Sequence, residues 1–373
     1  MTSPTLLTTN FPSRYVQGSG AMVQLIPELD KLGKHPVIYI DQNAYSAVID
    51  ALQPIPSHVS VFSVEAECTT KKIEKTLADL QSHNADCIVG MGGGKVIDLC
   101  RASADMLSDK LGRIIPFVSV PTVAASDAPC SSLAVIYSEE GAFVKDLFVK
   151  RPPNLVLVDS AIVIGAPART FAAGIGDAMA TWYEAESCLN SGTGNFCGGF
   201  ATQLSTMVAQ LCRDTLFENA VQAVEDCHNK RLSPAFEKVL EANILLSGIG
   251  FESVGVASAH AVHHGLTELP ASYERVHHLM HGEKVAFGVV VSMILNDKPQ
   301  SELEKVIRLF QAIDLPCNLD DLGIKPTDTH AIDIIATKTC EAGSIAYNEP
   351  VKITHEIVVD AIQRAHKAGK AMA

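Results

Sequence analysis

The chain has 373 residues, 47% of them hydrophobic and 19% charged, which is long enough for two globular domains with a large, mainly aliphatic core. A formal net charge of −13 at pH 7 argues against nucleic acid and anionic membrane surfaces as partners. The ten cysteines form no C-x-x-C pair, the N-terminus shows no signal-peptide pattern, and the apolar run VAFGVVVSMIL is too short to cross a bilayer. We therefore expect a cytoplasmic protein with buried free thiols.

Short β-rich runs alternate with amphipathic stretches between Pro36 and Asp159. In TTKKIEKTLADLQSHNA, for example, the apolar residues Ile73, Leu77 and Leu80 fall on one helical face. This alternation predicts a parallel sheet covered by helices, and the closer spacing of the last runs predicts a hairpin appended to that sheet. The predicted strands are 37–41, 60–64, 86–92, 114–122, 133–138 and 154–159.

After Asp159 the strand-like runs nearly vanish and long helical patterns follow. Gly165 and Pro167 punctuate the change, so the predicted domains are 1–166, an α/β domain, and 167–373, an all-helical domain. Thr354 is the predicted N-cap of the last helix, which we expect to end before Gly369. The predicted helices are 178–190, 200–224, 234–247, 257–267, 283–295, 302–312, 330–341 and 355–366.

A glycine-rich loop, GMGGGKVID, follows the apolar run 87–89 and opens a predicted helix. Its glycines let the backbone approach a ligand, and the helix N-terminus beyond them favours phosphate. The spacing is neither the Rossmann pattern, because Lys95 stands where the third glycine belongs, nor a P-loop, because Val96 follows the lysine. We favour pyrophosphate binding at Gly92, Gly93 and Gly94 over a plain strand-to-helix turn.

Asp41 ends the first clear strand, VIYID. A carboxylate at that place can accept hydrogen bonds from ribose hydroxyls, which would favour NAD over its 2′-phosphorylated form. The alternative is an ordinary strand-end aspartate that caps the next helix, and both interpretations stay open.

Six of the 13 histidines lie between Gly250 and Gly288. His260 sits among small residues, and His281 opens an apolar helix. Two imidazoles on neighbouring helices with one carboxylate would make a zinc-type site with an open position, and Asp177 in GIGDAMATWYEAE is the candidate carboxylate. If Asp177 starts a helix, the residue one turn later is Thr181 rather than another imidazole.

The clustered histidines can also be interpreted as residues without a functional role, either surface polar residues or hydrogen-bonded core rings. We favour it for the four histidines outside the candidate pair, and for the pair itself both interpretations stay open. The four are His263, His264, His277 and His278.

Five segments occur in an order that resembles the glycerol dehydrogenases of the iron-containing (group III) alcohol dehydrogenase family: GMGGGKVID, PTVAASDAPCSSLAVIY, GIGDAMATWYEAE, ASAHAVHHG and HGEKVAFG. The resemblance implies an N-terminal dinucleotide-binding α/β domain, an all-helical metal-binding domain, a site in the cleft between them, and a homo-oligomer, with an octamer among the options. It also implies catalytic zinc on Asp177, His260 and His281, with His277 or His278 as alternatives to His281. Thr181 fits zinc better than iron, since iron-using relatives carry a histidine there. The implied NAD contacts are Asp41, Gly92, Gly93, Gly94, Lys95, Asp98, Thr122, Ser131, Leu133 and Tyr137.

The function implied by the resemblance is NAD- and zinc-dependent oxidation of glycerol and related 1,2-diols to hydroxyketones, dihydroxyacetone in the case of glycerol. Zinc would lower the pKa of the hydroxyl to be oxidised, and a hydride would pass to the nicotinamide. The resemblance places Asp127 against the substrate, although an aspartate in ASDAP can equally cap its own turn. The alternatives are a same-fold enzyme with a charged substrate (a 2-oxo-acid reductase, glycerol-1-phosphate dehydrogenase or 3-dehydroquinate synthase) and a non-catalytic sensor of NAD or polyols.

Overall fold

The structure is a computed structural model that describes residues 6–139, 141 and 143–372. Its residue contacts divide the chain into two units. One unit comprises Phe11–Pro167 and Lys230–Leu232, and the other comprises Met1–Asn10, Ala168–Asn229 and Ser233–Ala373.

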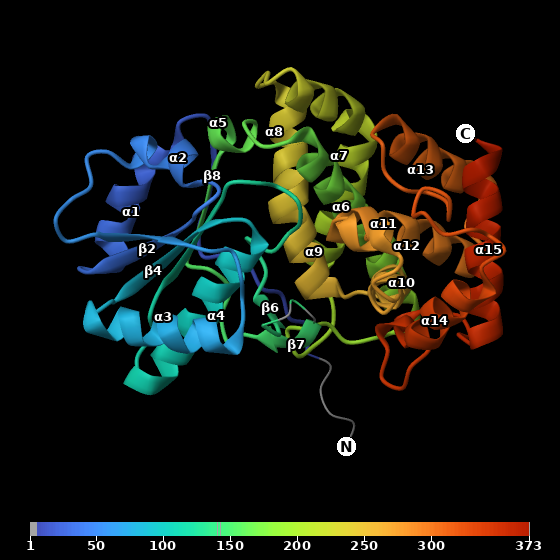
Figure 1. The fold of residues 1–373 in the computed structure, drawn as a ribbon, viewed down its shortest axis with the longest axis horizontal. Coiled ribbons are helices and arrows are strands. Elements are labelled where there is room, and N and C mark those ends of the chain that lie inside the picture. The colour runs from blue at the N-terminus through green and yellow to red at the C-terminus, as the bar shows by residue number, and fades with distance from the viewer. Residues whose placement is uncertain (1–5, 140, 142, 373) are drawn as a thin grey trace. The chain divides into compact units, whose positions relative to one another are not determined.

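The first unit is built on a six-stranded sheet in which every pair of neighbouring strands runs parallel (Figure 1). The predicted parallel sheet is therefore confirmed. The edge strand β1 was not predicted, because it is only four residues long and half-buried throughout. The strand order is β1-β8-β5-β4-β2-β3. The strands are β1 (Tyr15–Gly18), β2 (Pro36–Asp41), β3 (Ser60–Val64), β4 (Cys87–Gly92), β5 (Phe117–Pro121) and β8 (Leu155–Asp159).

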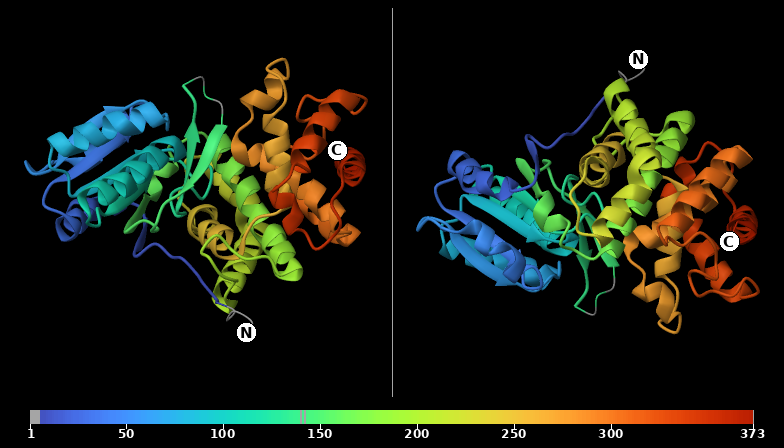
Figure 2. Two further views of the ribbon diagram at one scale, coloured as in Figure 1. Left: turned by 90° about the horizontal axis from the view of Figure 1, so that it is seen from below. Right: turned by 90° about the horizontal axis from the view of Figure 1, so that it is seen from above.

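Helices cover both faces of this sheet. Successive residues of a strand point to opposite sides, so a strand with apolar residues at every position has two faces to bury. Ile38 and Ile40 of β2 belong to a core shared with the helices around α1, whereas Val37 and Tyr39 pack with α3 and α4 (Figure 2). The helical segments of this unit are η1 (Ala21–Gln24), α1 (Leu25–Leu32), α2 (Tyr45–Val48), η2 (Asp50–Leu52), α3 (Thr70–Ser82), α4 (Gly94–Leu111) and α5 (Ser160–Val163).

The predicted hairpin forms from β6 (Leu133–Tyr137) and β7 (Phe143–Phe148), but it is a two-stranded sheet of its own rather than an extension of the parallel sheet. A buried ion pair on α4 explains the difference. Arg101 pairs with Asp98 and donates to the carbonyl oxygen of Leu133, and the other carboxylate oxygen of Asp98 accepts from Val135 N at 3.1 Å. These bonds hold β6 against α4 instead of against a sheet edge.

The second unit is helical, as predicted, and in its described residues the only strand-like pairing is the isolated bridge between Leu7 and Phe200. Its helix α12 is apolar and buried on nearly all sides, which marks it as the centre of the unit. The segments are α6 (Ala168–Ser191), α7 (Gln203–His228), α8 (Pro234–Glu241), the π-helical turn η3 (Ala242–Leu246), α9 (Ser247–Val254), α10 (Ser258–Thr267), α11 (Glu274–His278), α12 (His281–Leu295), α13 (Gln300–Ala312), α14 (Thr329–Thr339), η4 (Ile345–Asn348) and α15 (His355–Ala371).

Several helix boundaries differ from the prediction, and at two of them a glycine misled the prediction. Asp177 does not start a helix, because α6 begins at Ala168 and runs through Gly176. The last helix is capped by Thr354 as predicted but continues past Gly369. A Cβ at Gly369 would overlap the carbonyl oxygen of Cys317, so this glycine serves a close helix contact rather than a helix end.

All ten cysteines are free thiols, and eight of them are buried. In the described part of the chain, no single helix is both long and apolar enough to cross a membrane. The consecutive segments Pro234–Val254 and Ser258–Thr267, which meet at 101°, pass that test only as a bent pair.

Candidate functional site

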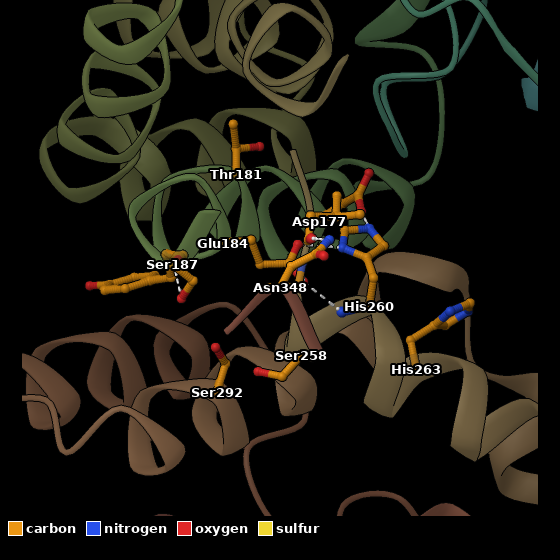
Figure 3. A network of polar contacts seen from close by, with 12 residues as sticks. Asp177, Thr181, Glu184, Ser187, Ser258, His260, His263, Ser292 and Asn348 are labelled. Carbon is orange, nitrogen blue, oxygen red and sulfur yellow. Dashed lines mark hydrogen bonds and ion pairs between the residues drawn. The ribbon is translucent and has the colours of Figure 1, made fainter. Parts of the chain in front are cut away.

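Three side chains from three helices converge inside the helical unit. Figure 3 shows two of them, Asp177 and His260, facing each other. Asp177 lies in the middle of α6, His260 in the first turn of α10, and His281 at the first position of α12. The Asp177 Oδ1 atom is 3.4 Å from His260 Nε2 and 3.0 Å from His281 Nε2. The side chain of Asp177 is only 5% exposed, while that of His281 is 42% exposed, so the cluster is buried on one side and accessible on the other.

Two glycines bring the Asp177 and His281 helices together. A Cβ at Gly282 would overlap the carbonyl oxygen of Ala173, and a Cβ at Gly176 would overlap that of Gly282. Each glycine is the immediate neighbour of a cluster residue, so the close backbone contact between α6 and α12 sets the separation of Asp177 and His281.

An ion pair fixes the N-terminus of α12 on α6. Glu283 accepts from the backbone N–H of Met280 at 2.6 Å, which satisfies a free donor at the helix start. The guanidinium of Arg169 donates to the same carboxylate through Nε at 2.6 Å and Nη2 at 2.8 Å. The position of His281, two residues before Glu283, is fixed by these bonds.

Glu184 orients the second imidazole. Its carboxylate is fully buried, and Oε2 lies 2.6 Å from Nδ1 of His260, which turns Nε2 of the same ring toward Asp177. Oε1 accepts from the backbone N–H groups of Ala257 and His260 at 2.9 Å each. One side chain thus anchors the start of α10 and aligns the ring that α10 carries.

The charges of this cluster support one another. Burial alone would raise the pKa of Asp177, but the positive charges of His281 and His260 hold that pKa well below its ordinary value. Burial alone would lower the pKa of His260, but the charge of Glu184 outweighs it, with help from Asp177, and raises the pKa well above the ordinary range. The carboxylate of Asp177 therefore remains ionised at the place where a cation would bind.

The ligand atoms of Asp177, His260 and His281 lie within 4.8 Å of one another. Zinc bonds of about 2.0–2.2 Å at tetrahedral angles place neighbouring ligand atoms roughly 3.3–3.6 Å apart. The separations of 3.0 and 3.4 Å are close to that range, and one carboxylate with two imidazoles is a donor set that suits zinc. Three ligands leave the fourth position open for water or substrate.

The remaining residues of the histidine cluster lie outside this group of three. His277 Nε2 lies 2.8 Å from the carbonyl oxygen of Leu269, and His278 is exposed on α11. Thr181 points away from His260 and shares a hydrogen bond of 2.9 Å with Ser247 (Figure 3). His263 is different, because its Nε2 lies 3.1 Å from Nδ1 of His281.

In the sheet unit, two of the predicted cofactor residues, Asp41 and Gly92, meet at the carboxyl edge of the sheet. The chain passes from β2 outward to β3 and then returns to the other side of β2 with β4, so the strand order reverses between β2 and β4. Such a switch point is where open α/β sheets bind ligands. Asp41 ends β2 and Gly92 ends β4, and a Cβ on Gly92 would stand only 2.8 Å from the Cβ of Asp41.

The two carboxylate oxygens of Asp41 have different surroundings. Oδ1 accepts from the backbone N–H of Asn43 at 2.9 Å, which is the capping role weighed as the alternative. Oδ2 faces Gly92, and a Cβ built on that glycine would be 3.5 Å from it. The geometry therefore accommodates both interpretations of Asp41 at once.

The other predicted contacts are spread around the start of α4. Lys95 lies above the ring of Tyr137, with Nζ 5.4 Å from the ring centroid, and forms an ion pair of 2.9 Å with Glu67. Thr122 N donates to Gly92 O at 3.0 Å, which places Thr122 beside the glycine loop. Ser131 is buried just before β6, and Leu133 is half-buried on that strand.

Asp98 stands apart from the other predicted contacts. Both of its oxygens are engaged inside the protein, by Arg101 and by Val135 N, and burial raises its pKa to about 6 against the opposing charge of Arg101. Its visible role is to hold the hairpin against α4.

Asp127 lies half-buried in the loop between β5 and β6. Its carbonyl oxygen accepts from Cys130 N at 2.9 Å, and Ser126 Oγ accepts from Ala128 N at 3.4 Å. The same loop reaches the glycine loop, since a Cβ at Gly94 would be 3.5 Å from the Cβ of Ala128.

Sequence reasoning missed Glu184, although a signal was present. Glu184 follows Asp177 by seven residues, or two helical turns, which places both carboxylates on one face of α6. A buried face with two acids spaced in this way indicates either paired cations or a metal site.

Comparison with known proteins gives matches over both units. Residues 12–160 match the family model of iron-containing alcohol dehydrogenases. The glycerol dehydrogenase of Thermotoga maritima is 40% identical over 370 residues, 98% of each chain, and that of Escherichia coli O6:H1 is 38% identical over 363 residues, 96% of each. The solved structure of a probable glycerol dehydrogenase from Sinorhizobium meliloti 1021 is 37% identical, with a TM-score of 0.89 over 99% of this chain and 100% of that one.

Proposed function

The chain belongs to the iron-containing alcohol dehydrogenase family, and from this premise we propose that it catalyses the NAD-dependent oxidation of glycerol and related 1,2-diols. The main support is the identity of up to 40% with glycerol dehydrogenases over nearly the whole chain. The product from glycerol would be dihydroxyacetone, and the metal would be zinc. The convergence of Asp177, His260 and His281 supports the metal dependence.

In this mechanism Asp177, His260 and His281 would hold the metal, and Glu184 would keep the His260 ring aligned. When bound, zinc would supply a Lewis acid that lowers the pKa of the substrate hydroxyl, and NAD would supply the hydride acceptor. The exposed side of His281 leaves room for a small diol to approach.

The sheet unit would bind the cofactor at its switch point. The N-terminus of α4 follows the glycine loop, and its free N–H groups and positive dipole end suit a pyrophosphate. Asp41 would accept hydrogen bonds from the adenosine ribose, and Lys95 and Tyr137 would lie beside the bound dinucleotide. We infer that Phe11–Pro167 acts as the NAD-binding domain.

Steady-state kinetics with zinc-loaded protein test the proposal. We expect reduction of NAD with glycerol or 1,2-diols at a far higher kcat/KM than oxidation of NADH with 2-oxo acids. One feature supports the charged-substrate alternative. Lys284 is half-buried one turn after His281, and its positive charge contributes to the lowered pKa of His263. A preference for 2-oxo acids would overturn the polyol assignment.

Cofactor choice should depend on the charge of Asp41. A 2′-phosphate at this place would meet like charge, and about 1.4 kcal/mol of repulsion corresponds to a factor of about 10 in affinity. We expect Asp41→Asn, which can still cap Asn43, and Asp41→Gly to lower the NAD/NADP ratio of kcat/KM by roughly tenfold or more. A ratio that stays at the wild-type value in both variants would leave Asp41 with the capping role alone.

Asp127 should discriminate between diols and simple alcohols. A charge-assisted hydrogen bond to a second hydroxyl contributes about 1.5–3 kcal/mol, or roughly 10- to 150-fold in kcat/KM. We expect Asp127→Ala to lose about that factor on glycerol and much less on a monohydric alcohol of similar size. Equal losses on both alcohols would assign Asp127 to its loop instead of to the substrate.

A further inference from the structure

Besides Glu184, a second side chain contacts the group of three from outside. His263 lies one turn after His260 on α10, and its Nε2 is 3.1 Å from Nδ1 of His281. The two rings meet edge to face, with centroids 4.3 Å apart and an interplanar angle of 69°. We propose that His263 is a positioning residue, which accepts a hydrogen bond from His281 and so keeps the Nε2 of His281 directed at the metal position. The inference rests on the metal-dependent function proposed above.

The bonding pattern dictates the proton positions. A neutral histidine that binds a metal through Nε2 carries its proton on Nδ1, and the partner of that N–H sets the ring orientation. For His281 the Nδ1 partner is His263 Nε2, so His263 must present a lone pair there. The proton of a neutral His263 then sits on its own Nδ1.

A proton on Nδ1 of His263 does not stabilise the fold. The Nδ1 atom of His263 is buried and has no hydrogen-bond partner within the described residues. A buried N–H without a partner destabilises a protein, so an apolar side chain would serve the fold at least as well. A polar group kept at a cost in stability indicates a role in the site.

His264 provides a matched control. It is the next residue of α10, its ring centroid is 5.4 Å from that of His263, and both residues are half-buried. Within the described chain it makes no hydrogen bond to either imidazole of the group of three. Loss of an imidazole from this part of α10 can therefore be separated from loss of the contact with His281.

The experiment compares wild-type protein with His263→Leu, His263→Gln and His264→Leu. The metal-free proteins are titrated with Zn²⁺ against a chromophoric chelator, and their thermal unfolding is recorded without metal. We expect His263→Leu to weaken Zn²⁺ affinity about 10- to 100-fold, the range seen when the outer partner of a metal-binding histidine is lost. Its metal-free melting temperature should equal or exceed that of the wild type. His263→Gln should recover most of the affinity, because its amide oxygen can take the place of Nε2, and His264→Leu should bind Zn²⁺ like the wild type.

Wild-type Zn²⁺ affinity in His263→Leu would overturn the proposal, as would equal losses of affinity in His263→Leu and His264→Leu. A lower metal-free melting temperature in His263→Leu with unchanged affinity would make the residue structural only. Wild-type protein that binds zinc but does not oxidise glycerol would defeat the proposed function while the affinity comparison still decides the role of His263. Wild-type protein that binds no zinc would overturn both.

Discussion

Replacing Asp177 by Asn, or His260 by Ala, is expected to abolish zinc binding and glycerol oxidation together while leaving the fold intact. Each change removes one of the three ligands that the described residues offer. Loss of an outer partner of a metal ligand lowers affinity by about 10- to 100-fold, so loss of a ligand should lower it by more than about 100-fold. Metal content and kcat/KM of the purified variants, with circular dichroism as a check on the fold, measure the effect.

Thr181→Val provides the control for these variants. Thr181 lies one turn after Asp177 on α6 and is equally buried, but its hydroxyl bonds to Ser247 and not to the cluster. We expect about 0.5–1.5 kcal/mol of lost stability, because the hydrogen bond between Thr181 and Ser247 is removed, with unchanged zinc content. Full zinc occupancy and normal turnover in Asp177→Asn or His260→Ala would refute the ligand assignment.

Glu184→Gln is expected to weaken zinc binding about 10- to 100-fold, because His260 loses its carboxylate partner. The glutamine oxygen can still accept from Ala257 N and His260 N, so the start of α10 should remain in place. Its amide nitrogen, however, would face the protonated Nδ1 of His260, donor against donor. Competition titration with a zinc chelator and kcat/KM on glycerol should fall in parallel.

Glu349→Gln is the control that separates the two roles of Glu184, which aligns the His260 ring and anchors the start of α10. Glu349 is also buried and also binds the start of α10, where Oε1 accepts from Ser258 N at 3.0 Å. It makes no bond to His260 within the described residues. We expect this variant to lose thermal stability and keep its zinc affinity. If both glutamate variants lost zinc affinity equally, Glu184 would act only by holding α10.

The parallel sheet and the helical unit could be predicted from sequence because periodicity is a local property. Val37 and Tyr39 alternate with Ile38 and Ile40 in β2, and that alternation alone assigns two packing faces. The hairpin was predicted but misplaced, because no local spacing reveals that Arg101 reaches the carbonyl oxygen of Leu133. Contacts between distant residues decide such placements.

The candidate site shows the same division. Asp177, His260 and His281 were predicted as a group from the residue pattern and from the resemblance, and the structure brings them together. Glu184 was overlooked, since a glutamate within a helical run usually faces solvent. Its role depends on α10 starting beside it, 73 residues later along the chain. Sequence patterns identify chemically suitable residues more readily than the partners that orient them.

The contact between α6 and α12 also bears on how this protein can evolve. Most steric conflicts in a core are relieved by a second substitution that shortens the opposing side chain. At Gly176 and Gly282 the opposing atoms are backbone carbonyl oxygens, those of Gly282 and Ala173. No substitution can shorten a backbone, so neither glycine has a compensating partner within reach. Both positions should therefore remain glycine even in relatives whose cofactor and substrate preferences have changed.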